Sequence, residues 1–146
     1  MITLREITGD NLEEILALRV AEGQRAYVSS NAESLAQAYV YRETAFPFGV
    51  YDGERPVGFI MMGYYEAKDY YTLWKFMIDE AEQGKGYGRQ ALELGIRFLQ
   101  EKFGIIEVYT GVIPGNAVAK GLYESFGFAE TGLFENGMLE MRLRIS

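Results

Sequence analysis

The sequence predicts an α/β (α+β) domain in which helices flank one mixed central sheet. Runs of β-branched and aromatic residues, typical of strands, alternate with segments whose apolar residues recur every three or four positions, as in amphipathic helices. The turn dipeptides Asp52-Gly53 and Asn136-Gly137 each separate two of the strand-like runs. Of the 146 residues, 49% are hydrophobic, enough to fill one core, so residues 1–146 are expected to form a single domain.

The amino-terminal part is expected to contain a short strand and two helices. Ile2 and Leu4 alternate with polar residues, as in a strand that is buried on one face. Asn11 and Glu14 have the spacing of a capping box, which predicts that a helix begins there. The apolar stripe of this helix is Leu12, Ile15, Leu16 and Val20. Residues 34–41 predict a second helix, with apolar positions at Leu35, Ala38 and Tyr39.

Three strands are expected in the middle of the chain. Residues 49–51 lead into the Asp52-Gly53 turn, and residues 57–65 after the turn are rich in strand formers. The polar stretch 66–69 separates this run from a third strand at residues 71–78. A hairpin followed by a further strand is therefore predicted.

The carboxy-terminal part predicts two helices and three strands. An amphipathic helix that ends at Gly104 has the apolar positions Ala91, Leu92, Gly95, Ile96, Phe98 and Leu99. A strand over 105–112 and a helix from Asn116 to residue 125, closed by Gly127, follow it. Residues 139–145 alternate after the Asn136-Gly137 turn. The expected order is strand, helix, helix, three strands, helix, strand, helix and two strands.

Composition restricts the chemistry. The chain has no cysteine and no histidine, which excludes thiol nucleophiles, Ser-His-Asp triads and the usual zinc ligands, so no metal site is expected. The net charge of −7 opposes nucleic-acid binding and favours a cationic small molecule. The first residues lack a signal segment, and no apolar run approaches the roughly 20 residues that cross a membrane, so a cytoplasmic location without membrane contact is expected.

A glycine-rich loop at residues 83–89 is the first candidate site. Gly84, Gly86 and Gly88 lie between a predicted strand and a predicted helix. The first turn of a helix has unpaired N–H groups, and glycines let a phosphate approach them closely, so the loop is a candidate pyrophosphate site. The spacing is neither that of a dinucleotide-binding motif nor that of a P-loop. The alternative is that the glycines only make a tight connection between strand and helix.

The second candidate motif is Asn116-x-x-Ala119-x-x-Leu122-Tyr123 followed by Gly127-Phe128. Together with Gln83-x-x-Gly86-x-Gly88 it resembles the two signature motifs of the GCN5-related N-acetyltransferases, the GNAT family. The predicted element order is similar to the GNAT fold over the whole chain. The resemblance implies a strongly twisted mixed sheet, acetyl-CoA as co-substrate, and direct transfer of the acetyl group to an amine without a covalent enzyme intermediate.

The resemblance also implies roles for individual residues. The backbone of the strand before the loop binds the pantetheine arm, and the loop amides bind the pyrophosphate, with added charge from two basic side chains. The cofactor-binding residues are then Phe76, Met77, Ile78, Gln83, Gly84, Lys85, Gly86, Tyr87, Gly88, Arg89 and Asn116. Asn116 is equally suited to cap a helix. Tyr123 matches the family tyrosine that protonates the departing thiolate, and its alternative role is core packing.

The general base and the acceptor are less defined by the sequence. The strand positions where many relatives have a carboxylate hold Trp74 and Gly111. Asp79 and Glu107 lie nearby in the sequence, and water is an alternative proton acceptor. Residues on the substrate side, by resemblance, are Glu22, Tyr27 and Glu43.

Residues 24–28 and 64–66 resemble bacterial spermine/spermidine acetyltransferases within the family. A polyamine suits an acidic chain with 11 tyrosines, because cations bind carboxylates and aromatic faces. Two alternatives are acetylation of a protein N-terminus or lysine, and a CoA-binding sensor module without catalysis. A homodimer is also expected, with residues 139–145 as an edge strand that pairs with a second copy.

Overall fold

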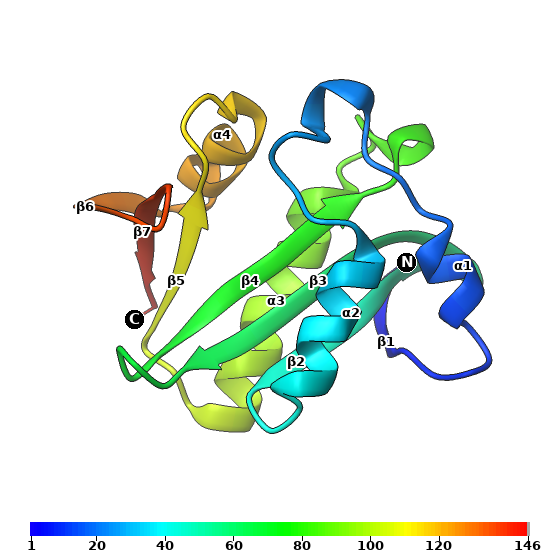
Figure 1. Ribbon diagram of the computed structural model, residues 1–146, viewed down its shortest axis with the longest axis horizontal. Coiled ribbons are helices and arrows are strands. Elements are labelled where there is room, and N and C mark those ends of the chain that lie inside the picture. Colours follow the sequence, from blue (N-terminus) through cyan, green and yellow to red (C-terminus); the bar gives the residue numbers. More distant parts are fainter. Residues whose placement is uncertain (146) are drawn as a thin grey trace.

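One seven-stranded sheet, in the order β1-β2-β3-β4-β5-β7-β6, forms the centre of the computed structural model, which describes residues 1–145 (Figure 1). The predicted mixed α/β class and the predicted element order are confirmed. The strands are β1 (Ile2–Glu6), β2 (Ala45–Asp52), β3 (Arg55–Tyr65), β4 (Tyr70–Ile78), β5 (Glu107–Val112), β6 (Ala129–Glu135) and β7 (Met138–Arg144). The helices are α1 (Leu12–Leu16), α2 (Asn31–Val40), α3 (Tyr87–Phe103) and α4 (Ala117–Phe126), with 3-10 turns η1 (Glu22–Gln24) and η2 (Glu80–Glu82).

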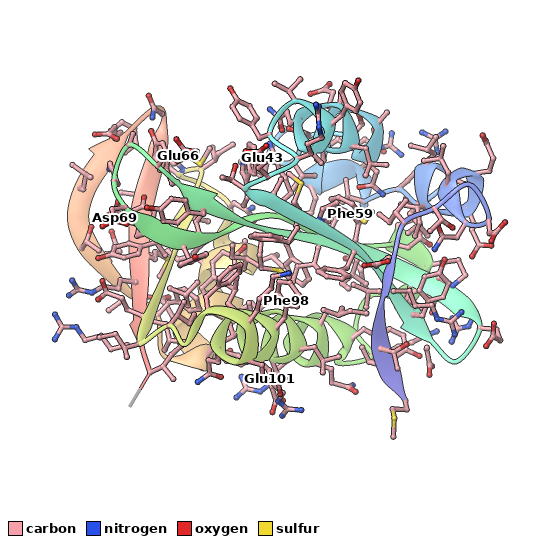
Figure 2. All side chains as sticks on the ribbon, turned by 90° about the horizontal axis from the view of Figure 1, so that it is seen from below. Glu43, Phe59, Glu66, Asp69, Phe98 and Glu101 are labelled. Carbon is pink, nitrogen blue, oxygen red and sulfur yellow. The ribbon has the colours of Figure 1, made fainter. Side chains whose placement is uncertain are left out.

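The helices cover both faces of the sheet. Figure 2 shows Phe98 of α3 pointing toward one face and Phe59 of β3 pointing toward α2 on the other. The core on the α3 side also includes Leu92, Leu99 and Tyr123. The smaller core on the α1 and α2 side includes Ile15, Ala38, Tyr51, Phe59 and Met77. Two apolar layers therefore hold the central strands rigidly, and β4 contributes side chains to both.

The sheet is antiparallel except between β4 and β5, which are parallel. These two strands pair only at Thr72 with Tyr109 and Leu73 with Thr110. Beyond these pairs they diverge, and α4 follows the end of β5 in Figure 1. The edge of β4 that faces away from β3 is consequently without a strand partner from residue 74 to residue 78.

A β-bulge in β4 changes which side chains face α2. Met61 pairs with Lys75 and Met62 pairs with Leu73, so Trp74 is an extra residue in β4. Trp74 packs edge-on against Tyr41, with ring centroids 5.9 Å apart, and the neighbouring Lys75 Nζ donates to Ser29 Oγ over 3.0 Å. Successive residues of a regular strand would point to opposite faces. The bulge lets both side chains contact the chain around α2.

The first helix is shorter than predicted, and the expected capping box is wrong. The Asn11 side chain makes no cap bond: Thr8 N–H donates to its Oδ1 and its Nδ2 donates to the Glu6 carbonyl. The amide thus connects the end of β1 to the helix start, and α1 ends at Leu16 after five residues, before Val20. By contrast, α2 begins at Asn31, earlier than predicted, because Ser30 Oγ accepts a hydrogen bond from Glu33 N–H.

The prediction that residues 139–145 form an edge strand is wrong. β7 pairs with β5 on one side and with β6 on the other, so the free edges of the sheet are β1 and β6. The hairpin turn itself is confirmed, with positive φ at Asn136 and Gly137. In the described chain, residues 1–145, no helix is long and apolar enough to cross a membrane.

Candidate active site

The loop before α3 forms the first part of the site. Gly84 and Gly86 both have a φ of +80°, a conformation that glycine adopts without strain, and Gly86 is the N-cap of α3. Their backbone leads directly into the first helical turn, whose N–H groups have no partner within the helix. Gln83 Nε2 donates to the Ile78 carbonyl over 3.2 Å, which ties the loop to the end of β4. The loop is therefore shaped to present amides to an anion.

A network of charged side chains supports this loop from behind. Glu82 binds Arg55 of β3 through one oxygen and Lys85 through the other, the latter at 2.8 Å. The hydrogen bond from Arg55 is the main reason that the pKa of Glu82 lies below its ordinary value, and Lys85 adds to the effect. Tyr87 donates to Asp52 over 2.6 Å and accepts from Arg55 over 3.2 Å. The loop is thereby anchored to the β2–β3 hairpin.

A cavity of about 340 Å³ begins at this loop and extends between the diverging strands. It runs along the unpaired edge of β4, where residues 74–78 line it. Of the predicted site residues it is lined by Tyr27, Phe76, Met77, Ile78, Gln83, Gly84, Gly86, Tyr87, Gly88, Asn116 and Tyr123. The predicted residues outside its lining are Glu22, Glu43, Lys85 and Arg89. The structure therefore brings the two sequence motifs together around one cavity.

Tyr123 lies on the wall of the cavity near the point where β4 and β5 separate. Its side chain is buried, with only 6% of the residue exposed, and it packs against Phe128 with ring centroids 5.6 Å apart. Burial raises the pKa of the phenol above its ordinary value of 10, and the polar Thr110 side chain acts in the opposite direction. Thr110 Oγ1 in turn donates to the Leu73 carbonyl over 3.1 Å. The phenol therefore keeps its proton at neutral pH.

Comparison with known proteins identifies the fold and the family. The family model described as "Acetyltransferase (GNAT) family" matches residues 12–128. The chain belongs to the GNAT acetyltransferase family. It is accordingly an N-acetyltransferase that uses acetyl-CoA, as the resemblance in the sequence implied.

Individual relatives of this acetyltransferase are similar over nearly the whole chain. The spermine/spermidine N(1)-acetyltransferase of Bacillus subtilis (strain 168) is 33% identical over 140 residues, 90% of each chain. The ribosomal-protein-S18-alanine N-acetyltransferase of Escherichia coli has a TM-score of 0.74 and 25% identity, covering 100% of this chain and 95% of its own. The PaiA N-acetyltransferase of Thermoplasma acidophilum, solved in complex with coenzyme A, has a TM-score of 0.74 and 18% identity over 99% of both chains. The last similarity concerns the fold alone.

The residues of this acetyltransferase fit coenzyme A. A Cβ at Gly84 would meet no atom within 4 Å. The positive φ of Gly84 nevertheless disfavours any residue except glycine, so the backbone of the loop stays uncovered by a side chain at this position. Asn116 is the N-cap of α4, with Oδ1 accepting from Ala119 N–H over 3.2 Å, which confirms the capping alternative. The same side chain also lines the cavity.

The two basic side chains of the loop are engaged with protein groups. Lys85 Nζ binds Glu82, and Arg89 Nη1 donates to Ser125 Oγ over 3.3 Å while its guanidinium lies over the Phe126 ring. Both side chains are exposed and lie beside the loop. The anion-binding groups that face the cavity are therefore mainly backbone amides.

The two strand positions where the resemblance implied a carboxylate hold Trp74 and Gly111. A Cβ at Gly111 would lie 2.8 Å from Met138 Sδ, so Met138 fills the space of a side chain there. Asp79 accepts hydrogen bonds from the N–H groups of Arg19 and Ala81, and Glu107 accepts one from Tyr109. Neither Asp79 nor Glu107 lines the cavity. Both carboxylates are accounted for by structural roles.

Sequence reasoning missed several polar side chains of the cavity wall, among them Ser29, Lys75 and Thr110. Burial lowers the pKa of Lys75, and Glu33 offsets this only in part. Lys75 immediately precedes Phe76 in a strand of apolar and aromatic residues. A lysine at such a position could have been recognised from the sequence as a candidate site residue. Ser29 and Thr110 carry no such signal, because only the fold brings them to the cavity.

A second cavity, of about 560 Å³, adjoins the first on the α2 side of the sheet. Trp74, Thr110, Gly111 and Met138 line both cavities. Its other walls combine tyrosines with carboxylates: Tyr41, Tyr65, Tyr70, Glu66, Glu135 and Glu140. None of these residues was predicted as part of the site, apart from the resemblance noted at residues 64–66.

Proposed function

We propose that this acetyltransferase transfers the acetyl group to a primary amine of a polyamine such as spermidine or spermine. The observation that carries the proposal is the junction of two cavities: one begins at the glycine loop, and the adjoining one has aromatic and acidic walls. Aromatic faces and carboxylates are the groups that bind alkylammonium ions. The net charge of −7 and the 33% identity to a spermine/spermidine N(1)-acetyltransferase support the same substrate class.

Acetyl-CoA would be held by the first cavity. In this proposal the loop amides from Gly84 to Arg89 bind the pyrophosphate, and the unpaired backbone edge of Phe76, Met77 and Ile78 binds the pantetheine arm. Gln83 holds the loop against Ile78, and Tyr87 holds it against Asp52. Lys85 and Arg89 add positive charge beside the loop. Asn116 fixes the start of α4 and contacts the arm from the opposite wall.

Tyr123 is proposed as the general acid. When bound, acetyl-CoA supplies the acetyl group as a thioester. The acceptor nitrogen must be neutral to form the new bond to the carbonyl carbon as the carbon–sulfur bond breaks. Tyr123 gives its proton to the departing sulfur, and it is suited to this because its raised pKa keeps the phenol protonated. The proton of the acceptor nitrogen passes to water in the open cavity, and the phenol regains a proton from the same water.

The acceptor would enter past the segment between α1 and α2. In Figure 1 this segment lies at the open end of the diverging strands. Tyr27 belongs to it and its hydroxyl lies 3.1 Å from where a Cβ of Gly115 would be, so the ring reaches across to the β5–α4 loop. Glu22 and Glu43 are exposed and outside the cavity lining. We assign Tyr27 to contact with the acceptor and the two carboxylates to attraction of a polycation from solution.

A thiol-release assay tests the proposal. Wild type and Tyr123→Phe are incubated with acetyl-CoA and spermidine, spermine, a lysine peptide or a peptide with a free N-terminus, and the cysteine-free protein adds no thiol background. Release with polyamines, reduced about a hundredfold or more in the variant, is the expected result. Release with peptides alone would assign the enzyme to protein acetylation. Tight acetyl-CoA binding without turnover on any amine would indicate a sensor module.

We further propose a homodimer that works in the cytoplasm. β6 is a free edge whose residues are all exposed, including Leu133 and Phe134. An unprotected strand edge with apolar side chains favours pairing with a second copy. Light scattering of the purified protein measures the mass: a dimer is expected, and Phe134→Glu should convert it to a monomer. A monomeric wild type at all concentrations would rule out this assembly.

A further inference from the structure

The second cavity already contains a cation of the kind that it would bind. Lys68, in the turn between β3 and β4, places its ammonium 2.9 Å from Glu135 and 3.3 Å from Glu140. The same ammonium lies 6.0 Å from the centroid of the Tyr70 ring, which stacks on Tyr109 at 3.9 Å. This wall therefore has the geometry to hold an alkylammonium ion between carboxylates and an aromatic face.

Two other acceptors of the cavity have no protein donor within residues 1–145. Gln37 lines the cavity from α2, and its Oε1 is buried without any hydrogen bond. A buried acceptor without a partner has lost its hydrogen bonds to water without replacement, and a bound N–H donor would restore one. Glu66 lines the cavity from the β3–β4 turn, and its carboxylate makes neither an ion pair nor a hydrogen bond there. Figure 2 shows Glu66 and Glu43 on the α2 side of the sheet.

The charges of the lining carboxylates and of Lys68 do not balance. The lining contains three carboxylates, those of Glu66, Glu135 and Glu140, and one ammonium, that of Lys68, which leaves an excess of two negative charges. When the reacting amine is neutral, spermidine presents two remaining ammonium groups and spermine presents one more. The cavity with Lys68 in place thus matches the charge of spermidine, and without Lys68 it matches that of spermine.

We propose that this second cavity binds the distal ammonium groups of the acceptor through Gln37 and Glu66, and that Lys68 limits the number of cations it holds. The inference rests on the proposed function and adds the residues that select among polyamines. The reacting amine reaches the first cavity at the shared wall of Trp74, Thr110, Gly111 and Met138. Lys68 and Gln37 are then specificity residues and not part of the acetyl transfer itself.

Steady-state kinetics with spermidine, spermine and butylamine test the inference. Gln37→Met removes the acceptor at nearly constant volume and should raise KM for both polyamines about tenfold, and clearly more than KM for butylamine. Gln37→Glu adds a carboxylate at the same place and should lower KM for the polyamines. The matched control is Gln100→Met, since Gln100 is exposed on α3, on the opposite face of the sheet.

Lys68→Met tests the charge argument. The ratio of kcat/KM for spermine to that for spermidine should rise about fivefold or more, a shift of the size expected for one added charge contact. The control is Lys120→Met, which removes one cation from a comparable ion pair, Lys120 with Glu130 at 3.0 Å, outside both cavities. Thermal melting of each variant confirms that it is folded.

The outcomes separate the two proposals. Unchanged polyamine KM in both Gln37 variants, together with an unchanged spermine-to-spermidine ratio in Lys68→Met, would overturn the inference while polyamine acetylation by the wild type stands. If the wild type acetylates butylamine or peptides but no polyamine, the proposed substrate class fails and this inference fails with it. Equal increases in KM for butylamine and the polyamines would assign Gln37 a structural role and overturn the inference.

Discussion

Thr110 Oγ1 donates a hydrogen bond to the Leu73 carbonyl over 3.1 Å at the last paired position of β4 and β5. The Thr110 side chain also lines the same cavity as the buried Tyr123 phenol and opposes the effect of burial on the pKa of that phenol. One threonine therefore connects the end of the strand pairing to the proposed acid.

Thr110→Val should weaken catalysis more than stability. Valine keeps the shape but removes the hydroxyl, which bonds Leu73 and affects the pKa of Tyr123, so we expect kcat to fall about fivefold and the free energy of unfolding to fall by about 1 kcal/mol. The control is Thr72→Val, because Thr72 Oγ1 donates to the Tyr109 carbonyl over 3.0 Å one pair away. This control should lose similar stability and retain kcat. Equal kcat values in the two variants would contradict the connection between Thr110 and Tyr123.

The activity should not decline through ionisation of Tyr123 below about pH 10. Its pKa is raised by burial, so the phenol remains protonated up to and beyond the ordinary value of 10 while the acceptor amine loses its proton. The rate of the wild type should therefore rise between about pH 7 and pH 9.5, and Tyr123→Phe should show the same rise at a rate about a hundredfold lower. A decline of the wild-type rate within this window that is absent from the variant would place the pKa of Tyr123 lower than burial requires.

Gly84→Ala should weaken cofactor binding through the backbone alone. A Cβ at this position meets no atom within 4 Å, but the φ of +80° makes an L-residue unfavourable by about 1–2 kcal/mol. We expect the Kd for acetyl-CoA, measured by calorimetric titration, to increase about tenfold with little change in the KM of the amine. Gly9→Ala is the control, since Gly9 also has open space around it and no positive φ. An unchanged Kd would show that the loop backbone does not contribute to binding.

Two helix glycines should respond in opposite directions to alanine. A Cβ at Gly95 of α3 would lie 2.9 Å from Ile60 Cδ1 and 3.0 Å from Met62 Sδ, so Gly95→Ala should destabilise the protein by about 1–3 kcal/mol. A Cβ at Gly121 of α4 would meet no atom within 4 Å, and the residue is exposed, so Gly121→Ala should stabilise the protein by about 0.5–1 kcal/mol. Chemical denaturation measures both. A stabilising Gly95→Ala would contradict the close packing of α3 on β3.

Arg55→Met should reduce the dependence of stability on acid pH. The pKa of Glu82 is lowered mainly by its hydrogen bond from Arg55, so this bond stabilises the fold above the unfolded pKa of about 4.3 and is lost as pH falls through the lower folded pKa. The wild type should therefore lose Tm steeply below about pH 4.5, and the variant should start lower and lose less. Calorimetry across this window measures the difference. Parallel Tm curves for the two proteins would contradict the role of Arg55.

Local sequence signals predicted the elements that local interactions determine. Gly104 ends α3 in a left-handed conformation, and Asn136-Gly137 forms the terminal hairpin, as their residue types require. The prediction for α1 failed because the Asn11 side chain binds Thr8 and Glu6 in place of the helix start. The hydrogen-bond partners of Asn11 depend on where β1 ends, and the spacing of residues in the sequence does not specify that position.

The sequence by itself determined the α/β class, the glycine loop before α3 and the two motifs that mark an N-acetyltransferase, because each rests on residues adjacent in the chain. Only the tertiary structure decided that β7 lies inside the sheet, that Trp74 and Lys75 both reach the α2 side, and that Gln37, Glu66 and Lys68 line one cavity. Strand order, bulges and cavities arise from packing between segments distant in the sequence. Such packing depends on the total apolar surface that the segments bury together and on how closely they fit, and no single sequence motif specifies it.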